Sequence, residues 1–212
     1  DNPLVSIVIP VYNGANYMKE AIDSALNQTY ENIEVLVIND GSKDDGETEK
    51  IALSYGDKIR YFHKENGGVS SALNLGIREM KGEYFSWLSH DDVYFPEKVS
   101  SQIDVLEKYG DANTVCYCDS IHINKDSKKI SKRKSRYTFT CEQITDYKEV
   151  LLNLFKYGSF NGCALLIPKN IFTDNDLYFD ESMRYSQDLL MWYRIFLKGY
   201  SLIYTDEIGV KN

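Results

Sequence analysis

Four clusters of polar and glycine residues each follow a short apolar run, and their side chains suit ligand binding and acid-base or metal chemistry. The clusters are residues 10–14, 39–42, 65–68 and 89–92. The runs before them are rich in β-branched or aromatic residues, as β-strands are. Because ligands of an open parallel sheet bind beyond the carboxyl ends of its strands, we expect the four clusters to form one site.

Asp40 and Tyr12 carry functional groups that suit a pyrimidine base. A carboxylate at a strand end can accept a hydrogen bond from the imide N–H of uracil or thymine, and a tyrosine ring can stack on the base. The alternative for Asp40 is a simple turn, which Asp-Gly-Ser commonly forms. The motifs G-x-G-x-x-G and G-x-x-x-x-G-K-[ST] are both absent, which disfavours a hydride-transfer Rossmann protein and a P-loop NTPase.

Asp91 and Asp92 are adjacent carboxylates after the fourth apolar run. They fit two interpretations: an acidic turn that supports a helix beginning at Pro96, or hard oxygen ligands for a divalent cation. Magnesium and manganese need only one or two protein carboxylates when substrate phosphates complete the coordination. With the neighbouring clusters considered, the pattern favours the cation, with one carboxylate free to turn toward a ribose hydroxyl.

The first half of the chain alternates strand and helix patterns, which predicts an α/β fold with a mostly parallel sheet covered on both faces. Pro96 suits the first position of a helix, and Gly110 is typical of the residue that follows one. The predicted strands are residues 5–10, 33–39, 59–63 and 84–88, and the predicted helices are residues 16–27, 47–54, 70–80 and 96–109.

The second half is less regular and is expected to be an α+β extension of the same sheet. The pattern predicts strands at residues 114–117 and 164–167 and helices at residues 146–157 and 188–197. Residues 125–136 hold seven Lys or Arg in twelve positions, which is typical of a solvated hairpin or loop. Such a cluster also attracts anionic lipid headgroups, at roughly 1 kcal/mol per charge, so peripheral membrane contact is an alternative role.

The composition excludes several classes of protein. With 212 residues, of which 43% are hydrophobic and 26% charged, the chain resembles a soluble globular domain with a substantial core. No apolar run approaches the roughly 18 residues that span a bilayer. The 24 Lys and Arg against 32 Asp and Glu leave a net charge of −8, which repels phosphate backbones and argues against nucleic-acid binding.

The four cysteines, Cys116, Cys118, Cys141 and Cys163, are too irregularly spaced for a disulfide framework. Alternation along a strand places Cys116 and Cys118 on one face, where buried reduced thiols are favoured over a zinc site. The sequence opens at Asp1 without a charged and then apolar leader. We therefore expect a cytoplasmic protein, with any membrane contact at the inner face.

Five segments together resemble glycosyltransferase family 2, whose members have the GT-A fold, a Rossmann-like sheet flanked by helices. They are residues 5–13, 37–44, 65–76, 88–96 and 179–199, and the most specific stretch is Asn66-Gly67-Gly68-Val69-Ser70-Ser71-Ala72-Leu73-Asn74-Leu75-Gly76. The resemblance implies an inverting transfer of a sugar from a nucleoside diphosphate donor. It implies one domain over residues 1–212, with a nucleotide-binding half at 1–118 and an acceptor-side half at 119–212, the latter truncated because relatives usually continue.

Carried over residue by residue, the resemblance implies that Asp40 binds uracil against Tyr12, and that Asp91 and Asp92 hold the ribose and the metal-bound diphosphate. Residues 186–194 are similar to the acidic catalytic motif of the family, so Asp188 is the candidate general base, with a helix N-cap as the alternative. The candidate nucleotide-binding residues are Pro10, Tyr12, Asn13, Asp40, Asn66, Gly67, Gly68, Ser71 and Asp91; the candidate ligands of Mn²⁺ or Mg²⁺ are Asp92 and Asp91.

The implied donor is a UDP-sugar and the implied acceptor a glycan or a lipid-linked glycan. Two residues depart from the family pattern: Ser89 stands where many members carry the first Asp of a D-x-D-D run, and Leu73 where many carry Arg. These departures leave open an inactive nucleotide-sugar-binding partner subunit. His90 is either a substitute ligand or a solvent-facing loop residue. A sugar nucleotidyltransferase is disfavoured because the first loop does not resemble G-G-x-G-T-R.

Overall fold

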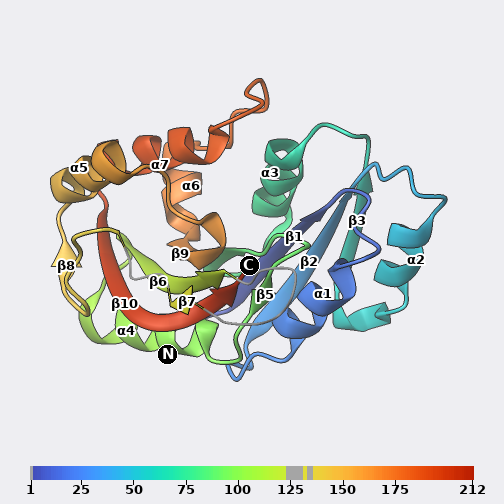
Figure 1. The fold of residues 1–212 in the computed structure, drawn as a ribbon, viewed down its shortest axis with the longest axis horizontal. Helices are drawn as coiled ribbons and strands as arrows, with labels where there is room; N and C mark the ends of the chain where they lie inside the picture. Colours follow the sequence, from blue (N-terminus) through green and yellow to red (C-terminus); the bar gives the residue numbers. More distant parts are fainter. Residues whose placement is uncertain (1, 123–130, 133–135) are drawn as a thin grey trace.

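The computed structural model describes residues 2–122, 131–132 and 136–212. Within these residues the strands form a sheet with the order β3-β2-β1-β4-β9-β6-β10-β5, to which β7 is added beside β6 and β8 beside β10 (Figure 1). The strands are β1 (Val5–Val11), β2 (Ile33–Asp40), β3 (Arg60–Lys64), β4 (Tyr84–Trp87), β5 (Val93–Tyr94), β6 (Thr114–His122), β7 (Ser131–Lys132), β8 (Ile144–Thr145), β9 (Leu165–Pro168) and β10 (Ser201–Lys211). The helices are α1 (Met18–Leu26), α2 (Glu47–Leu53), α3 (Val69–Glu79), α4 (Lys98–Tyr109), α5 (Tyr147–Tyr157), α6 (Lys169–Asn175) and α7 (Gln187–Leu197), with short 3₁₀ helices η1 (Gly56–Lys58) and η2 (Gly162–Ala164).

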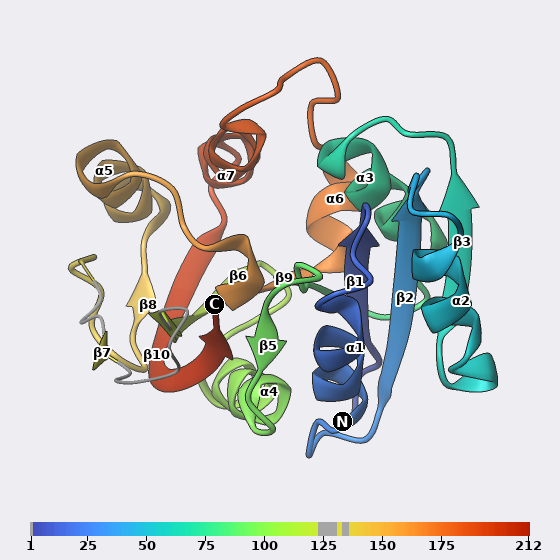
Figure 2. The ribbon, with the colours of Figure 1, turned by 45° about the vertical axis from the view of Figure 1, so that its right-hand side comes forward.

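The first half confirms the expected parallel sheet. β3, β2, β1 and β4 are hydrogen-bonded side by side, and all three pairings are parallel. Every residue of β1 is buried, as expected for a central strand with helices packed against the sheet. Figure 2 shows β1 to β3 together with α1, α2 and α3 on one side of the molecule. The carboxyl ends of these strands therefore lie near one another, as the four polar clusters require.

The second half joins the same sheet, and it does so through antiparallel pairings. β9 lies between β4 and β6 and runs antiparallel to both. The predicted helices at 146–157 and 188–197 appear as α5 and α7, within one residue at each end. The expectation of an α+β extension of the sheet is thus confirmed.

The longest strand of the structure, β10, was not predicted. It pairs parallel to β6, with register shifts between Thr205 and Ile208 and between Ile208 and Val210. The polar residues Thr205 to Glu207 and the glycine at 209 break the alternation that marks a strand in sequence. Irregular pairing of this kind is typical of β-bulges, whose extra residues the pattern of a single strand does not show.

The helix expected from Pro96 begins at Lys98, and residues 93–94 before it form β5, which pairs with β10. Asp91 and Asp92 therefore precede a strand. The interpretation of the two carboxylates as the acidic first turn of a helix is wrong. The helix does end at Tyr109, with Gly110 as its C-cap, as predicted.

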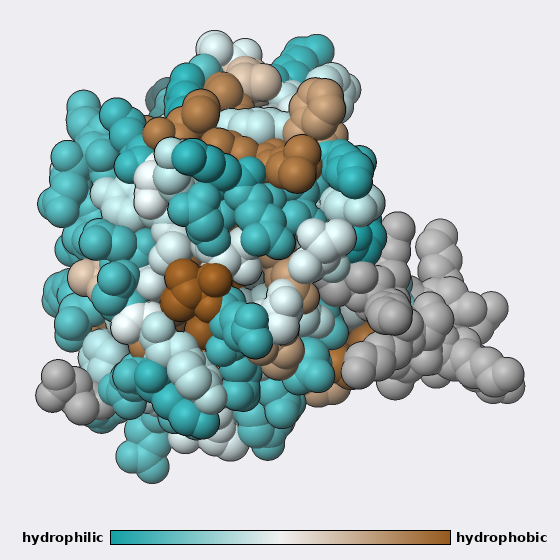
Figure 3. Space-filling view, turned by 90° about the vertical axis from the view of Figure 1, so that its left-hand side faces the viewer, coloured by the Kyte–Doolittle hydropathy of each residue, from teal (hydrophilic) through white to brown (hydrophobic). Residues whose placement is uncertain are grey.

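The face that carries α5 and β8 exposes large apolar side chains, and Figure 3 shows apolar surface on this side. Ile144, Leu152 and Phe155 are exposed, Phe155 by 81%. Most of the basic stretch at 125–136 lies outside the described residues, so its predicted loop and membrane contact stay predictions. Among the described helices, none combines the length and the apolar character needed to cross a membrane.

The buried thiols agree with the sequence-based expectation. Cys116 and Cys118 are completely buried in β6 and are not in disulfides. Burial raises the pKa of the Cys118 thiol to about 11, so the thiol stays protonated at neutral pH. Both side chains act as small apolar residues of the core.

Candidate functional site

A pocket of about 230 Å³ lies at the carboxyl ends of β1, β2 and β4. Tyr12 is 43% exposed and lines this pocket together with the buried Asp40. The structure thus brings together residues from three of the four predicted clusters and from the first turns of α3. The lining residues are Pro10, Val11, Tyr12, Asp40, Val69, Ala72, Ser89, His90 and Asp91.

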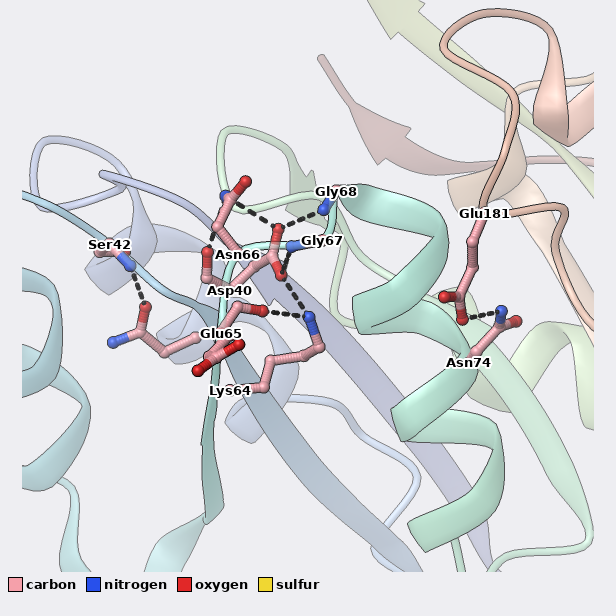
Figure 4. A network of polar contacts seen from close by, with 10 residues as sticks. Asp40, Ser42, Lys64, Glu65, Asn66, Gly67, Gly68, Asn74 and Glu181 are labelled. Carbon is pink, nitrogen blue, oxygen red and sulfur yellow. Dashed lines mark hydrogen bonds and ion pairs between the residues drawn. The ribbon is translucent and has the colours of Figure 1, made fainter.

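The carboxylate of Asp40 is already held by several donors, as Figure 4 shows. Oδ1 accepts from Lys64 Nζ at 2.7 Å and from the backbone N–H of Gly67 at 3.0 Å. Oδ2 accepts from the backbone N–H of Gly68 at 2.8 Å and from Asn66 Nδ2 at 3.3 Å. These contacts tie β2 to the loop before α3. A base imide therefore has to share or displace one of these donors, a constraint that the sequence did not show.

The glycines beside Asp40 meet two different constraints, which are close packing and a positive φ. A side chain at Gly67 would meet Ser71 Oγ at 2.8 Å and Lys64 Nζ at 3.0 Å, and Gly68 has φ of +91°. Gly41 has φ of +67° and approaches the backbone of Asn66 so closely that a Cβ would lie 2.6 Å from its nitrogen. The glycines thus let two loops approach closely beside Asp40.

Five of the candidate nucleotide-binding residues lie outside the pocket lining: Asn66, Gly67 and Gly68 in the loop that holds Asp40, and also Asn13 and Ser71. Asn13 joins two loops: its backbone N–H donates to Ser42 Oγ at 2.9 Å, and its Oδ1 accepts from the backbone N–H of Lys43 at 2.7 Å. The hydroxyl of Ser71 lies beside Gly67, and Ser71 does not line the pocket. We therefore expect Asn13 and Ser71 to support the shape of the site.

Asp91 and Asp92 diverge, as adjacent carboxylates in a turn can. Asp91 is exposed and lines the pocket beside Tyr12 and Asp40. Asp92 is half-buried, and its Oδ2 accepts a hydrogen bond from the thiol of Cys163 at 3.3 Å. Burial raises the pKa of Asp92 to about 6; the hydrogen bond from Cys163 opposes this rise, and the charge of Asp91 adds to it.

The chemistry of these carboxylates fits a divalent cation. A half-buried carboxylate whose pKa is raised by burial and by a neighbouring negative charge gains from a positive charge beside it. The described residues contain no group of three or more His, Cys, Asp or Glu side chains that could hold an ion alone. One or two carboxylates are what Mg²⁺ or Mn²⁺ would need from the protein if substrate phosphates supplied the other ligands, and Asp92 and Asp91 would fit that role.

The structure also places His90 and Leu73, the two residues whose roles the sequence left open. His90 is half-buried and lines the pocket, close enough to Gly14 that a Cβ there would lie 2.9 Å from the imidazole. His90 is thus a loop residue that is partly open to solvent and lies at the pocket. Leu73 is completely buried in the core, so the position where many relatives carry Arg presents no group to the pocket.

Asp188 lies in a second pocket, of about 330 Å³. It is the second residue of α7, whose N-cap is Ser186, so the N-cap interpretation is wrong. Its Oδ1 accepts from the backbone N–H of Leu189 at 2.8 Å, and its Oδ2 accepts from Ser159 Oγ at 3.1 Å. Further along α7, Trp192 is fully buried, and Arg194 forms an ion pair with Asp180 at 3.6 Å.

The second pocket contains residues that the sequence analysis missed. Asp119, two residues beyond the predicted end of its strand, lines it and accepts from Tyr204 Oη at 2.8 Å. The rule that sites lie at strand ends would have pointed to Asp119. Ser159 and Asn161 gave no such signal, because their loop becomes a wall of the pocket only by packing against α7. The lining residues are Tyr117, Asp119, Ser120, His122, Arg136, Tyr137, Ser159, Phe160, Asn161 and Asp188.

Comparison with solved structures tests the predicted fold. S. aureus TarS residues 1–349 in complex with UDP superposes with a TM-score of 0.80 at 21% identity, over 98% of this chain and 60% of that one. At this identity the match concerns the fold alone. It confirms the expected GT-A fold.

Sequence comparison gives the family. An uncharacterized glycosyltransferase of Rickettsia bellii is 55% identical over 206 residues, which are 97% of this chain and 29% of that protein. The hyaluronan synthase of Pasteurella multocida is 38% identical over 146 residues, which are 68% of this chain and 15% of the synthase. The chain thus spans less than a third of either relative. The model of the family described as "Glycosyl transferase family 2" matches residues 6–164, and the chain belongs to this glycosyltransferase family.

Proposed function

We propose that this domain transfers a sugar from a UDP-sugar to a hydroxyl group of a glycan or lipid-linked glycan, with inversion and with help from a divalent cation. The observation that carries the proposal is the placement of three carboxylates around two pockets. Asp40 and Asp91 line the first pocket, and Asp188 lines the second. The similarity in fold to TarS, which has been solved with UDP and with UDP-GlcNAc, supports a UDP-sugar as donor.

In the proposed reaction the first pocket holds the nucleotide. The ring of Tyr12 lies against the base, while Asp40 accepts from the imide N–H in exchange for one of its present donors. Asp92, assisted by Asp91, would hold the cation. A divalent cation bound there stabilises the negative charge of the departing diphosphate.

Asp188 is the proposed general base. It takes the proton from the acceptor hydroxyl while that oxygen attacks the anomeric carbon from the face opposite the diphosphate. One carboxylate is sufficient because a diphosphate is a good leaving group, unlike the sugar alcohol released in glycoside hydrolysis, which needs a second carboxyl group as acid. A single displacement inverts the anomeric configuration. Ser159, which donates to Asp188 Oδ2, holds the carboxylate in place.

The function is tested by a screen of nucleotide-sugar donors with manganese, in which release of the nucleoside diphosphate is measured with and without glycan acceptors. We expect UDP-sugars to be consumed faster than the other donors, and stereochemical analysis of the product to show inversion. Binding of a UDP-sugar with no turnover across the acceptor panel would instead support the inactive partner subunit. Retention of the anomeric configuration would contradict the single displacement.

Asp40 is expected to matter for donor affinity. Asp40→Asn keeps the size of the side chain but removes the charge, and hydrogen bonds to charged groups are worth about 1.5–3 kcal/mol. We therefore expect UDP affinity in calorimetry to fall about ten- to a hundredfold. Because the buried carboxylate also pairs with Lys64, thermal melting must show that the variant is folded.

The matched control for Asp40 is Glu65→Gln. Glu65 is an exposed acid on the loop that Asp40 contacts, and it does not line the pocket. This variant is expected to bind UDP like the wild type. If folded Asp40→Asn also binds UDP like the wild type, Asp40 acts only as a structural link between β2 and α3.

A further inference from the structure

The turn that carries Asp92 is held at both ends by one thiol. Its backbone closes when the N–H of Asp92 donates to the carbonyl of Ser89 at 3.0 Å. Cys163 Sγ accepts from the backbone N–H of Ser89 at 3.4 Å and donates to Asp92 Oδ2 at 3.3 Å. The side-chain oxygen of Ser89, Oγ, also lies within hydrogen-bonding distance of this sulfur, at 3.5 Å. The thiol therefore links the first and last residues of the turn and fixes one oxygen of the carboxylate.

The position of Cys163 is itself determined by close packing. Its backbone N–H donates to Asn161 Oδ1 at 3.0 Å, which caps η2. At Gly162 a Cβ would lie 2.3 Å from the ring of Trp87, the last residue of β4. Only glycine allows η2 to pack this closely against the strand that leads into the turn. Cys163 is 2% exposed as a result.

The same segment contacts the proposed base. Ser159 Oγ donates to Asp188 Oδ2 at 3.1 Å, and Cys163, four residues later, donates to Asp92. Asp92 and Asp188 come from different halves of the chain, yet one short segment contacts both. The way in which residues 159–163 pack therefore affects the position of both carboxylates.

We propose that Cys163 is a positioning residue for the cation site: its thiol holds Asp92 Oδ2 and leaves Oδ1 as the oxygen that binds the cation. This inference rests on the proposed role of Asp92 as a cation ligand. Magnesium and manganese prefer oxygen ligands, whereas thiols suit softer metals. The thiol therefore acts through Asp92 and is not itself a ligand.

The test is a manganese titration of the protein with saturating UDP, in which free Mn²⁺ is measured by electron paramagnetic resonance. Loss of a side chain that orients a metal ligand typically lowers metal affinity about 10–100-fold, and we expect this for Cys163→Ala. Cys163→Ser keeps a donor and an acceptor of similar size, so it should retain most of the affinity. Cys116→Ala, which also removes a buried thiol, should bind Mn²⁺ like the wild type.

Three results would overturn the inference in distinguishable ways. If Asp92→Asn lowers Mn²⁺ affinity but Cys163→Ala does not, Cys163 serves packing alone. If the wild type binds Cd²⁺ more tightly than Mn²⁺ and Cys163→Ser loses that preference, the thiol is a ligand. If Asp92→Asn binds Mn²⁺ like the wild type, Asp92 is not a cation ligand, and the role of Cys163 that depends on it is refuted as well. Should Cys163→Ala not fold, Cys163→Val fills the volume without a donor and takes its place.

Discussion

Replacing Asp188 with Asn is expected to lower the rate of glycosyl transfer at least about a hundredfold, because general-base catalysis typically contributes about 10²- to 10⁴-fold. A base acts on the transition state, so UDP affinity should stay unchanged. Asn has the shape of Asp: its one oxygen can still accept from the backbone N–H of Leu189, and its NH₂ group can donate to Ser159 Oγ, which would then act as the acceptor. The measurement compares kcat with UDP affinity for an acceptor that supports turnover.

The control for Asp188→Asn is Asp180→Asn. Asp180 is also acidic and near α7, but it pairs with Arg194 at 3.6 Å and lies outside the pocket of Asp188. Its replacement should leave the rate within the error of the assay. If Asp188→Asn transfers sugar at most of the wild-type rate, the base lies elsewhere, and Asp119 in the same pocket is the next residue to replace.

Replacing Asp92 with Asn is expected to abolish the dependence of UDP binding on the cation. The wild type should bind UDP more tightly with manganese or magnesium than with chelator, because the ion joins Asp92 to the diphosphate. The neutral amide is a much weaker ligand, so the two affinities should become equal. Isothermal calorimetry under both conditions measures this difference directly.

The same variant should not weaken the fold. Burial raises the pKa of Asp92 from its ordinary value of 3.8 to about 6. A carboxyl group whose pKa is higher in the folded state than in the unfolded state destabilises the fold at pH values above both, so at pH 7.5 a neutral Asn should keep or raise the melting temperature. Full activity of the wild type in excess chelator would show that transfer does not depend on the cation.

The fold class followed from the sequence because local patterns were strong. β1 is a run of apolar, mostly β-branched residues, and the alternation with amphipathic helices allows few arrangements other than a parallel sheet. The carboxyl ends of such strands lie at one edge, so the clusters around Tyr12, Asp40 and Asp91 could be assigned to one pocket. The structure confirms that placement.

The second half was harder because its elements depend on partners distant in sequence. β10 is interrupted by polar residues and is held by pairing with β6. The two-residue strand β5 forms only because β10 lies beside it. No local pattern contains this information. The sequence therefore predicted a helix as the next element after Asp92, whereas in the structure the next element is the strand β5.

The sequence by itself determined the family resemblance, the parallel half of the sheet and the residues able to do chemistry, because residue types and their periodicity are local properties. Only the tertiary structure decided what those residues contact. It showed that the carboxylate of Asp40 accepts hydrogen bonds from Lys64, Gly67 and Gly68. It also showed that Cys163 donates to Asp92 although 71 positions separate them in the sequence. Such contacts depend on how closely loops and strands pack, and close packing is a property of the folded chain as a whole.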